Sequence, residues 1–220
     1  MNITLSSNRG PLIYGGLTFF KSNNNTVVSS EICNNSYGVC LYYSDWNIFY
    51  HNSFANNYRH VVPDFQSPFM NTSSGYFSAS VWDDGFEGNY WGDYTGEDEN
   101  KDGIGDTLYV VSSAPSNQYD HYPLIGMFHS FDVSYIVPNC RVTVVSNSTI
   151  SDFNVLVWIE HPEVRLIEFN VAGESGVGFC RICIPHELMS PPYIVIIDNG
   201  QTSVLHYNGT VFNNGTHTWI

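Results

Sequence analysis

The amino-acid sequence predicts an all-β protein in which a short right-handed parallel β-helix, of about three to four coils, precedes an Ig-like β-sandwich. Three features lead to this prediction: a repeat in residues 1–60, an aromatic and acidic segment that follows it, and evenly spaced Val/Ile-rich segments near the end. We therefore expect β-helix repeats in residues 1–80, a segment that closes the β-helix in residues 81–128, and the sandwich in residues 129–220.

The repeat is visible where residues 25–35 are aligned with residues 47–57 at an offset of 22 residues. The Asn pairs of the two segments superpose, and Ile32 falls on Phe54. A further segment fits the same pattern one repeat earlier, where Asn2 aligns with Asn25. A period in the low twenties with short strands is typical of a solenoid, and the Leu framework of leucine-rich repeats is missing. A parallel β-helix therefore fits this repeat better.

Stacked coils explain the composition of the repeat. One coil cannot bury its own apolar face, whereas neighbouring coils place residues such as Ile32, Val39 and Leu41 in one continuous core. We interpret the recurrent Asn residues as a structural ladder of side-chain hydrogen bonds along the axis, rather than as a ligand-binding row. Because the chain begins inside a repeat, we expect its first coil to present an open edge on which other copies can assemble.

Oxygen-bearing side chains recur at every second position of the segment that starts at Asp98, and Gly103 follows the third of them. This spacing is typical of a calcium loop, in which Ile104 would add its backbone carbonyl. An EF-hand has a bidentate Glu where this chain has Tyr109, so we expect one carboxylate to come from outside the loop, with Glu97 among the candidates. The sequence therefore predicts a structural Ca²⁺ ion, with the ligands Asp98, Asn100, Asp102, Ile104, Asp106, Asp120 and Asp93.

Four segments of this region resemble the end of a known family. They are Trp82-Asp-Asp-Gly85, Gly88-Asn-Tyr-Trp91, residues 102–110 and Tyr122-Pro-Leu124. They are similar to NosD-like right-handed β-helix repeat proteins, which are common among secreted and cell-surface proteins of archaea. The resemblance covers about residues 1–128 and implies the β-helix fold and an extracellular location. The subfamily that gives the family its name assists copper-site maturation, but this sequence has no His-x-His or Met-rich cluster, and we do not expect copper.

Residues 141–207 contain short Val/Ile-rich segments at regular spacing, separated by turns such as Asp198-Asn-Gly200. This pattern is typical of a β-sandwich. The region also resembles the Ig-like module that often follows such β-helices at archaeal surfaces, through Asn147–Phe153, Gly178-Phe-Cys-Arg181 and Ile184-Pro185.

The charge balance limits the partners of the chain. The formal net charge is −14, with seven Lys and Arg residues against 21 Asp and Glu residues. Nucleic acid and anionic membrane surfaces are poor partners for such a chain, because both require a basic face. Divalent cations and neutral sugars fit the composition better. No apolar run is long enough to span a bilayer.

Seven Asn-x-Ser/Thr motifs indicate export if they carry glycans, and they lie at Asn2, Asn24, Asn34, Asn71, Asn147, Asn208 and Asn214. No leader is visible after Met1, so either a signal has been removed or the chain is part of a longer product. Five cysteines are disulfide candidates: Cys33, Cys40, Cys140, Cys180 and Cys183. The odd number leaves one unpaired or bonded to another chain, and Cys140 with Cys180 or Cys183 is the pairing to test.

No catalytic constellation is apparent, because Asp83 and Asp84 point apart in a strand and basic residues are scarce. We expect an extracellular, calcium-stabilised structural protein without enzyme activity, which assembles through its open N-terminal coil or its C-terminal strand into a filament, sheath or layer. A carbohydrate-binding or adhesion module is the alternative. A fragment of a polysaccharide lyase or hydrolase is the third interpretation.

Overall fold

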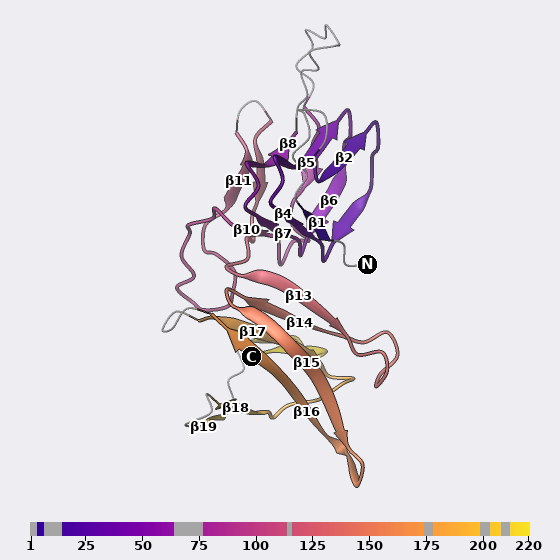
Figure 1. The fold of residues 1–220 in the computed structure, drawn as a ribbon, viewed down its shortest axis with the longest axis vertical. Helices are drawn as coiled ribbons and strands as arrows, with labels where there is room; N and C mark the ends of the chain where they lie inside the picture. Colours follow the sequence, from indigo (N-terminus) through magenta and orange to yellow (C-terminus); the bar gives the residue numbers. More distant parts are fainter. Residues whose placement is uncertain are drawn as a thin grey trace, which may run out of the picture. The chain divides into compact units, whose positions relative to one another are not determined.

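The structure, a computed structural model, describes residues 4–6, 15–63, 77–113, 116–173, 178–198, 203–207 and 212–220. All regular elements within these residues are β-strands. No helix in this part of the chain is long and apolar enough to cross a membrane. The chain divides into two compact units, Met1–Phe128 and His129–Ile220, which differ in how their strands are arranged (Figure 1).

Three parallel sheets make up the first unit, with the strand orders β1-β4-β7-β10, β2-β5-β8 and β3-β6-β9. Consecutive strands belong to different sheets, so the chain winds around and returns to each sheet one coil later (Figure 1). This arrangement is the predicted β-helix-type fold, whereas its handedness stays a prediction. The strands are β1 (Thr4–Ser6), β2 (Leu17–Phe20), β3 (Thr26–Val28), β4 (Glu31–Cys33), β5 (Tyr37–Tyr42), β6 (Asn47–Tyr50), β7 (Ser53–Ala55), β8 (Arg59–Val62), β9 (Ser80–Val81) and β10 (Tyr90–Trp91).

The register of the central coils follows the repeat seen in the sequence. Leu17 pairs with Val39, and Ile32 pairs with Phe54. These pairs confirm the predicted offset between neighbouring coils. The first coil is longer than predicted, because Thr4 of β1 pairs with Glu31 of β4, whereas the sequence alignment places Thr4 on Val27.

Aromatic rings fill much of the space inside the coils. Phe49 stacks on Trp82 with ring centroids 4.5 Å apart, and Phe54 stacks on Trp91 at 4.4 Å. Tyr109 stacks on Trp91 in turn, also at 4.4 Å. Each buried aromatic side chain removes about 150–250 Å² from water, so these stacks dominate the apolar contribution to stability. The other buried members of this core are Ile32, Val39, Leu41 and Val61.

Asn side chains form ladders between the coils. The backbone N–H of Asn25 donates to the Oδ1 atom of Asn47, and that of Asn35 donates to Asn57, both at 2.9 Å and both across 22 residues. The side-chain amide of each donor residue bonds the same oxygen as its backbone. The structural interpretation of these Asn residues is therefore confirmed.

After the last coil, β11 (Tyr109–Ser112) pairs with β12 (Gln118–Asp120) in antiparallel fashion. Leu124 is fully buried, and it bridges to Tyr90 and to Ile104. These contacts return the chain to the last coil and close that end of the β-helix.

The second unit contains a five-stranded sheet with the order β13-β14-β17-β21-β20 and two separate hairpins, β15-β16 and β18-β19. A buried cluster that includes Val142, Val155 and Leu188 forms its core. The unit is all-β as predicted, but the packing of two full sheets in an Ig-like sandwich stays a prediction. The strands are β13 (Met127–Asp132), β14 (Arg141–Ser146), β15 (Thr149–Trp158), β16 (His161–Ala172), β17 (Cys180–Pro185), β18 (Ile194–Asp198), β19 (Ser203–Tyr207), β20 (Phe212–Asn213) and β21 (His217–Trp219).

The substitution Asn52→Ala tests the ladders. The Oδ1 atom of Asn52 accepts the backbone N–H of Ser30 at 3.1 Å, and its amide donates to the carbonyls of Val27 and Tyr50. The substitution leaves these partly or fully buried groups unpaired, so we expect the free energy of unfolding, measured by urea denaturation, to fall by about 3 kcal/mol. Asn56→Gly is the control, because Asn56 is exposed with φ +53°. It should change stability by less than about 0.5 kcal/mol.

Candidate functional site

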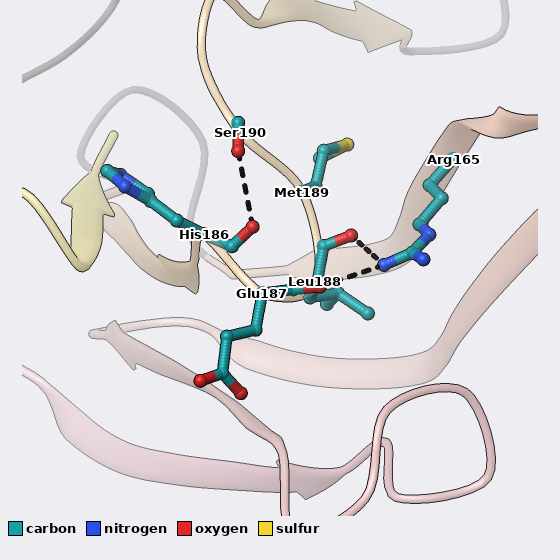
Figure 2. A pocket seen from close by; sticks show the side chains of 6 residues that line it. All are labelled: Arg165, His186, Glu187, Leu188, Met189 and Ser190. Atoms are coloured by element: carbon teal, nitrogen blue, oxygen red, sulfur yellow. Dashed lines mark hydrogen bonds between the residues drawn. The ribbon is translucent and has the colours of Figure 1, made fainter.

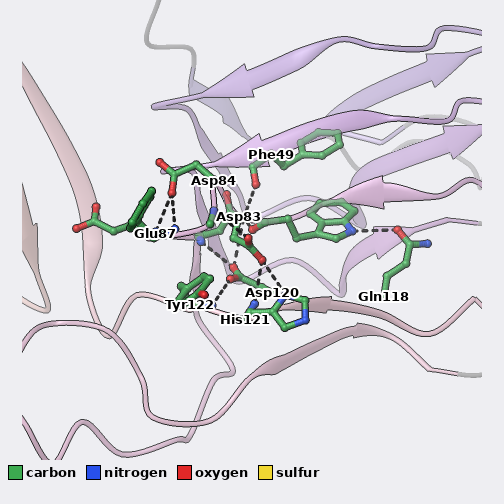
Figure 3. Close-up of polar contacts among 12 residues, drawn as sticks. Phe49, Asp83, Asp84, Glu87, Gln118, Asp120, His121 and Tyr122 are labelled. Carbon is green, nitrogen blue, oxygen red and sulfur yellow. Dashed lines mark hydrogen bonds and ion pairs between the residues drawn. The ribbon is translucent and has the colours of Figure 1, made fainter.

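One ladder ends at a carboxylate instead of an amide. The backbone N–H of Asn52 donates to the Oδ1 atom of Asn89 at 3.1 Å, and the N–H of Asn89 donates to the Oδ2 atom of Asp120 at 2.7 Å. An Asn side chain can accept from one coil and donate to another, whereas a carboxylate only accepts. Asp120 therefore occupies the place of the next rung and terminates the ladder (Figure 3).

Asp120 collects further donors at this position. The indole N–H of Trp91 donates to its Oδ2 atom at 2.8 Å, and the backbone N–H of Tyr122 donates to its Oδ1 atom at 3.0 Å. A Cβ at Gly88 would lie 1.9 Å from a carboxylate oxygen, so no larger residue fits there. Asp120 is fully buried, and this desolvation raises its pKa to about 6, although the hydrogen bonds from Trp91 and Asn89 oppose the shift.

Gln118 ends a neighbouring row of hydrogen bonds at the same end of the β-helix. Its Oε1 atom accepts the indole N–H of Trp82 and the backbone N–H of Ser80, both at 3.0 Å, and its amide donates to the carbonyl of Ser78 at 2.7 Å. Figure 3 shows Gln118 and Asp120 on the same strand, directed at the last coil. The two residues of β12 thus hold both core tryptophans through their indole N–H groups.

Histidine–carboxylate pairs occur around the closed end. His51 and Glu87 lie 2.8 Å apart, and His121 and Asp83 lie 3.0 Å apart. The third pair joins His60 and Asp93 at 3.2 Å, where desolvation lowers the pKa of His60 although Asp93 opposes this shift. Each pair consists of one histidine and one carboxylate, and each links loop residues to a strand or to a neighbouring loop.

The loop at residues 98–106 is held by backbone hydrogen bonds. The carboxylate of Asp98 accepts the N–H groups of Asp102 and Gly103 at 3.1 and 2.9 Å. Asp106 accepts the N–H of Glu99 at 2.7 Å, and the Oδ1 atom of Asp102 accepts the N–H of Ile104 at 2.8 Å. The alternating Asp and Asn residues therefore form Asx-type turns, in which a side chain bonds the backbone two or more residues away.

The predicted Ca²⁺ ion is wrong. Among the described residues, no three His, Cys, Asp or Glu side chains gather closely enough to hold a metal ion, although Asp98, Asn100, Asp102, Ile104 and Asp106 all lie among them. The two ligands expected from outside the loop have other partners: Asp120 terminates the Asn ladder, and Asp93 accepts the hydroxyl of Tyr109 at 2.9 Å. The carboxylates of the loop accept hydrogen bonds from N–H groups of the loop's own backbone.

The second unit has a shallow hollow of about 310 Å³, lined by Arg165 and residues 186–190 (Figure 2). The Nη1 atom of Arg165 donates to the carbonyls of Leu188 and Glu187, the latter at 3.2 Å. Figure 2 shows the guanidinium directed at these carbonyls, with the Glu187 carboxylate pointing away from it. The arginine thus secures the turn that follows β17, and we assign no ligand to the hollow.

The remaining predicted sites are distributed over both units. Of the glycosylation motifs, Asn24, Asn34, Asn147 and Asn214 are exposed, and Asn2, Asn71 and Asn208 lie outside the described residues. All five cysteines are described, and no disulfide joins any of them in the structure. Cys33, Cys40, Cys140 and Cys183 are buried, and Cys180 is exposed.

Sequence reasoning missed Asn89 and Gln118 and assigned Asp120 to the wrong partner. The Asn52 and Asn89 rungs are 37 residues apart, and Asp120 follows 31 residues later, so the period of 22 residues in the earlier coils does not align them. The signal that could have identified Asn89 is its residue type and its neighbours. It is an Asn between Gly88 and two aromatic residues, in a chain whose other Asn residues repeat in each coil.

Comparison with known proteins gives a match to a protein family. Residues 2–96 match the model of a family described as periplasmic copper-binding protein (NosD). This match lies within the first unit and supports the resemblance stated for that part of the chain. No curated protein and no solved structure matches the chain.

The described residues do not fit a copper ion, which the description of that family names. In the matched segment, His51 and His60 face separate carboxylates, and Cys33 lies 3.3 Å from the Oε1 atom of Glu31. No group of three or more His, Cys, Asp and Glu side chains converges anywhere in the described part of the chain.

Asp120 gives a prediction for pH dependence. Its pKa in the folded protein is raised from 3.8 to about 6, so the folded state binds the proton more tightly than the unfolded state. The associated stability is fully present below pH 3.8 and is lost as the pH rises through about 6. Asp120→Asn removes this titration and leaves a side-chain amide opposite the N–H of Tyr122, so wild type should be the more stable protein.

We expect that advantage of wild type over Asp120→Asn, measured by urea denaturation at several pH values, to be larger by roughly 3 kcal/mol at acidic pH than at neutral pH. Taking the difference between the two proteins removes the opposite contribution of His60, whose pKa is lowered. A difference that does not change with pH would contradict the assignment.

Asp98 tests the loop. Asp98→Ala removes the acceptor for the N–H groups of Asp102 and Gly103, so we expect the free energy of unfolding to fall by about 1–2 kcal/mol. Excess chelator should leave the melting temperature of wild type and variant unchanged, since the loop is held by its own backbone. A melting temperature of wild type that drops with chelator would contradict this account.

Proposed function

We propose that this chain is a non-catalytic structural protein that acts outside the cytoplasm and associates with further copies through an apolar arm of its second unit. The arm is the outer part of the β15-β16 hairpin, residues 156–166. The observation that carries the proposal is the exposure of large apolar side chains on this hairpin. Contiguous exposed apolar surface of this kind marks interaction sites in soluble proteins.

The register of the hairpin shows that apolar residues occupy both of its faces. Val155 pairs with Ile167 and Leu156 with Leu166. Val155 and Ile167 pack into the core of the unit, so Leu156 and Leu166 point to the opposite side, where they are 44% and 51% exposed. A half-covered antiparallel sheet normally carries polar residues on that side. Trp158, 58% exposed, pairs with His161 next to the turn.

The end of the arm is equally apolar. Ile159 is 93% exposed in the turn between the strands, and Val164 is exposed on β16. In the second hairpin, Ile194, Ile196 and Ile197 of β18 are exposed as well. Burying such side chains contributes about 25 cal/mol per Å², which favours association over exposure to water.

Association with further copies fits the hairpin better than other partners. Among the described strands, β15 pairs only with β16, so each presents a free edge on which a further strand can add. An apolar surface is complementary to itself and requires no matching charge, so a second copy of this chain can pair with it through the same residues. β21 lies between β17 and β20 in its sheet, which favours the arm over the C-terminal strand as the contact.

Two observations support the remaining parts of the proposal. The family matched by residues 2–96 is described as periplasmic, which supports a location outside the cytoplasm. Asp120, whose pKa is shifted toward neutrality, has no exposed surface and is used by the ladder, so it is not available to a substrate. This favours a structural role over catalysis.

The substitutions Ile159→Asp and Leu166→Asp test the arm. Wild type should sediment as larger species as its concentration rises, whereas both variants should stay monomeric, because a carboxylate is costly to bury at an apolar contact. Both side chains are exposed, so the melting temperature should change little. Phe86→Asp is the matched control, since Phe86 is 80% exposed in the first unit and should leave association unchanged. A wild type that stays monomeric at every concentration would overturn the proposal.

A further inference from the structure

Trp46 lies on the surface of the first unit, at the corner between β5 and β6, and is 65% exposed. Trp82 and Trp91 of the same unit are only 1% exposed each. A tryptophan at the surface of a soluble domain loses the apolar burial that normally stabilises this residue.

The backbone at Trp46 makes the residue more unusual still. Its φ angle is +59°, in the left-handed region that bulky residues rarely adopt. At the equivalent corner one coil earlier, the chain has Asn24 with φ +57°, and Asn tolerates this conformation. The N–H of Trp46 donates to the carbonyl of Ala79 at 2.7 Å, so the next coil fixes the corner. Neither packing nor backbone conformation explains a tryptophan here, which points to a contact with a ligand.

An apolar strip lies on the outer face of the β3-β6-β9 sheet, next to the corner that carries Trp46. Ile48, two residues after Trp46, pairs with Val81 in the next coil, and the two side chains are 36% and 43% exposed. Thr26 pairs with Ile48 from the preceding coil and is exposed too. Strands of neighbouring coils lie about 4.8 Å apart, so the strip crosses several coils along the axis.

Polar groups border the strip at the corner. The N–H of Asp45 donates to the Oδ1 atom of Asn23 at 2.7 Å, and the Oδ1 atom of Asp45 accepts the N–H of Ala79 at 2.9 Å. Asp45 directly precedes Trp46 in the chain, so the Asn23 amide and the Asp45 carboxylate form a fixed group of donors and acceptors at the same corner.

We propose that the strip formed by Trp46, Ile48 and Val81, with Asn23 and Asp45 at its border, binds a neutral saccharide chain. A sugar ring has an apolar C–H face that stacks on an indole, and hydroxyl groups at its edge that bond to amides and carboxylates. An acidic polysaccharide is disfavoured by the net charge of −14. The site lies within the first unit and does not depend on the arm of the second.

Binding of cellohexaose, maltohexaose and mannohexaose to the whole chain tests the proposal, with calorimetry and tryptophan emission as readouts. At least one probe should bind wild type at roughly millimolar concentration and shift the emission of Trp46 to shorter wavelength. Trp46→Asn should weaken this binding by about tenfold or more. Its melting temperature should be unchanged or raised by about 2 °C, since Asn suits the left-handed corner.

Tyr58→Asn is the matched control, because Tyr58 is 83% exposed in the same unit and lies outside the strip. It should bind the saccharide as wild type does. The proposal is overturned if none of the three probes binds, or if Trp46→Asn binds as tightly as wild type. It is also overturned if Trp46→Asn abolishes self-association without any effect on saccharide binding, because the strip would then be a contact between copies.

Discussion

The ladder that runs from Ser30 through Asn52 and Asn89 to Asp120 is the constraint on which the first unit depends. In a stack of parallel coils the sheets hold the strands together, but the corners between strands leave buried N–H groups without partners. The Asn side chains provide these partners from one coil to the next. A ladder of amides cannot simply stop inside a core, because its last N–H would be left unpaired.

Asp120 supplies the acceptor that the last N–H of the ladder needs, but this places a carboxyl group in the core. As an acceptor it completes the ladder and also receives the indole N–H of Trp91, so the same atom ties the polar ladder to the aromatic core. In return a carboxyl group is buried completely, and its pKa rises toward neutrality. The shifted pKa at this site is thus a consequence of closing the fold. The two candidate binding surfaces, the Trp46 strip and the apolar arm, lie elsewhere on exposed side chains.

The sequence predicted the repeat of 22 residues and its Asn ladder because identical rungs recur at identical spacing. It did not predict the closed end, where the offsets change to 37 and 31 residues and Asp replaces Asn. The loop from Asp98 to Asp106 shows why spacing alone misled: Asp and Asn at alternate positions can bond backbone N–H groups two or more residues away as readily as a cation. In the second unit, the spacing of Val/Ile-rich segments and turns located strands but could not show which faces are covered.

Native-state hydrogen exchange tests the central role of Asp120 most directly, by measuring how slowly individual backbone N–H groups of the folded protein exchange with solvent. If the ladder and its terminating carboxylate hold the first unit together, the N–H groups of Ser30, Asn52 and Asn89 exchange only through unfolding of the whole unit, and are among the slowest in the chain. Exchange of the Asn89 N–H through small local openings, while Ser30 and Asn52 stay protected, would contradict the account.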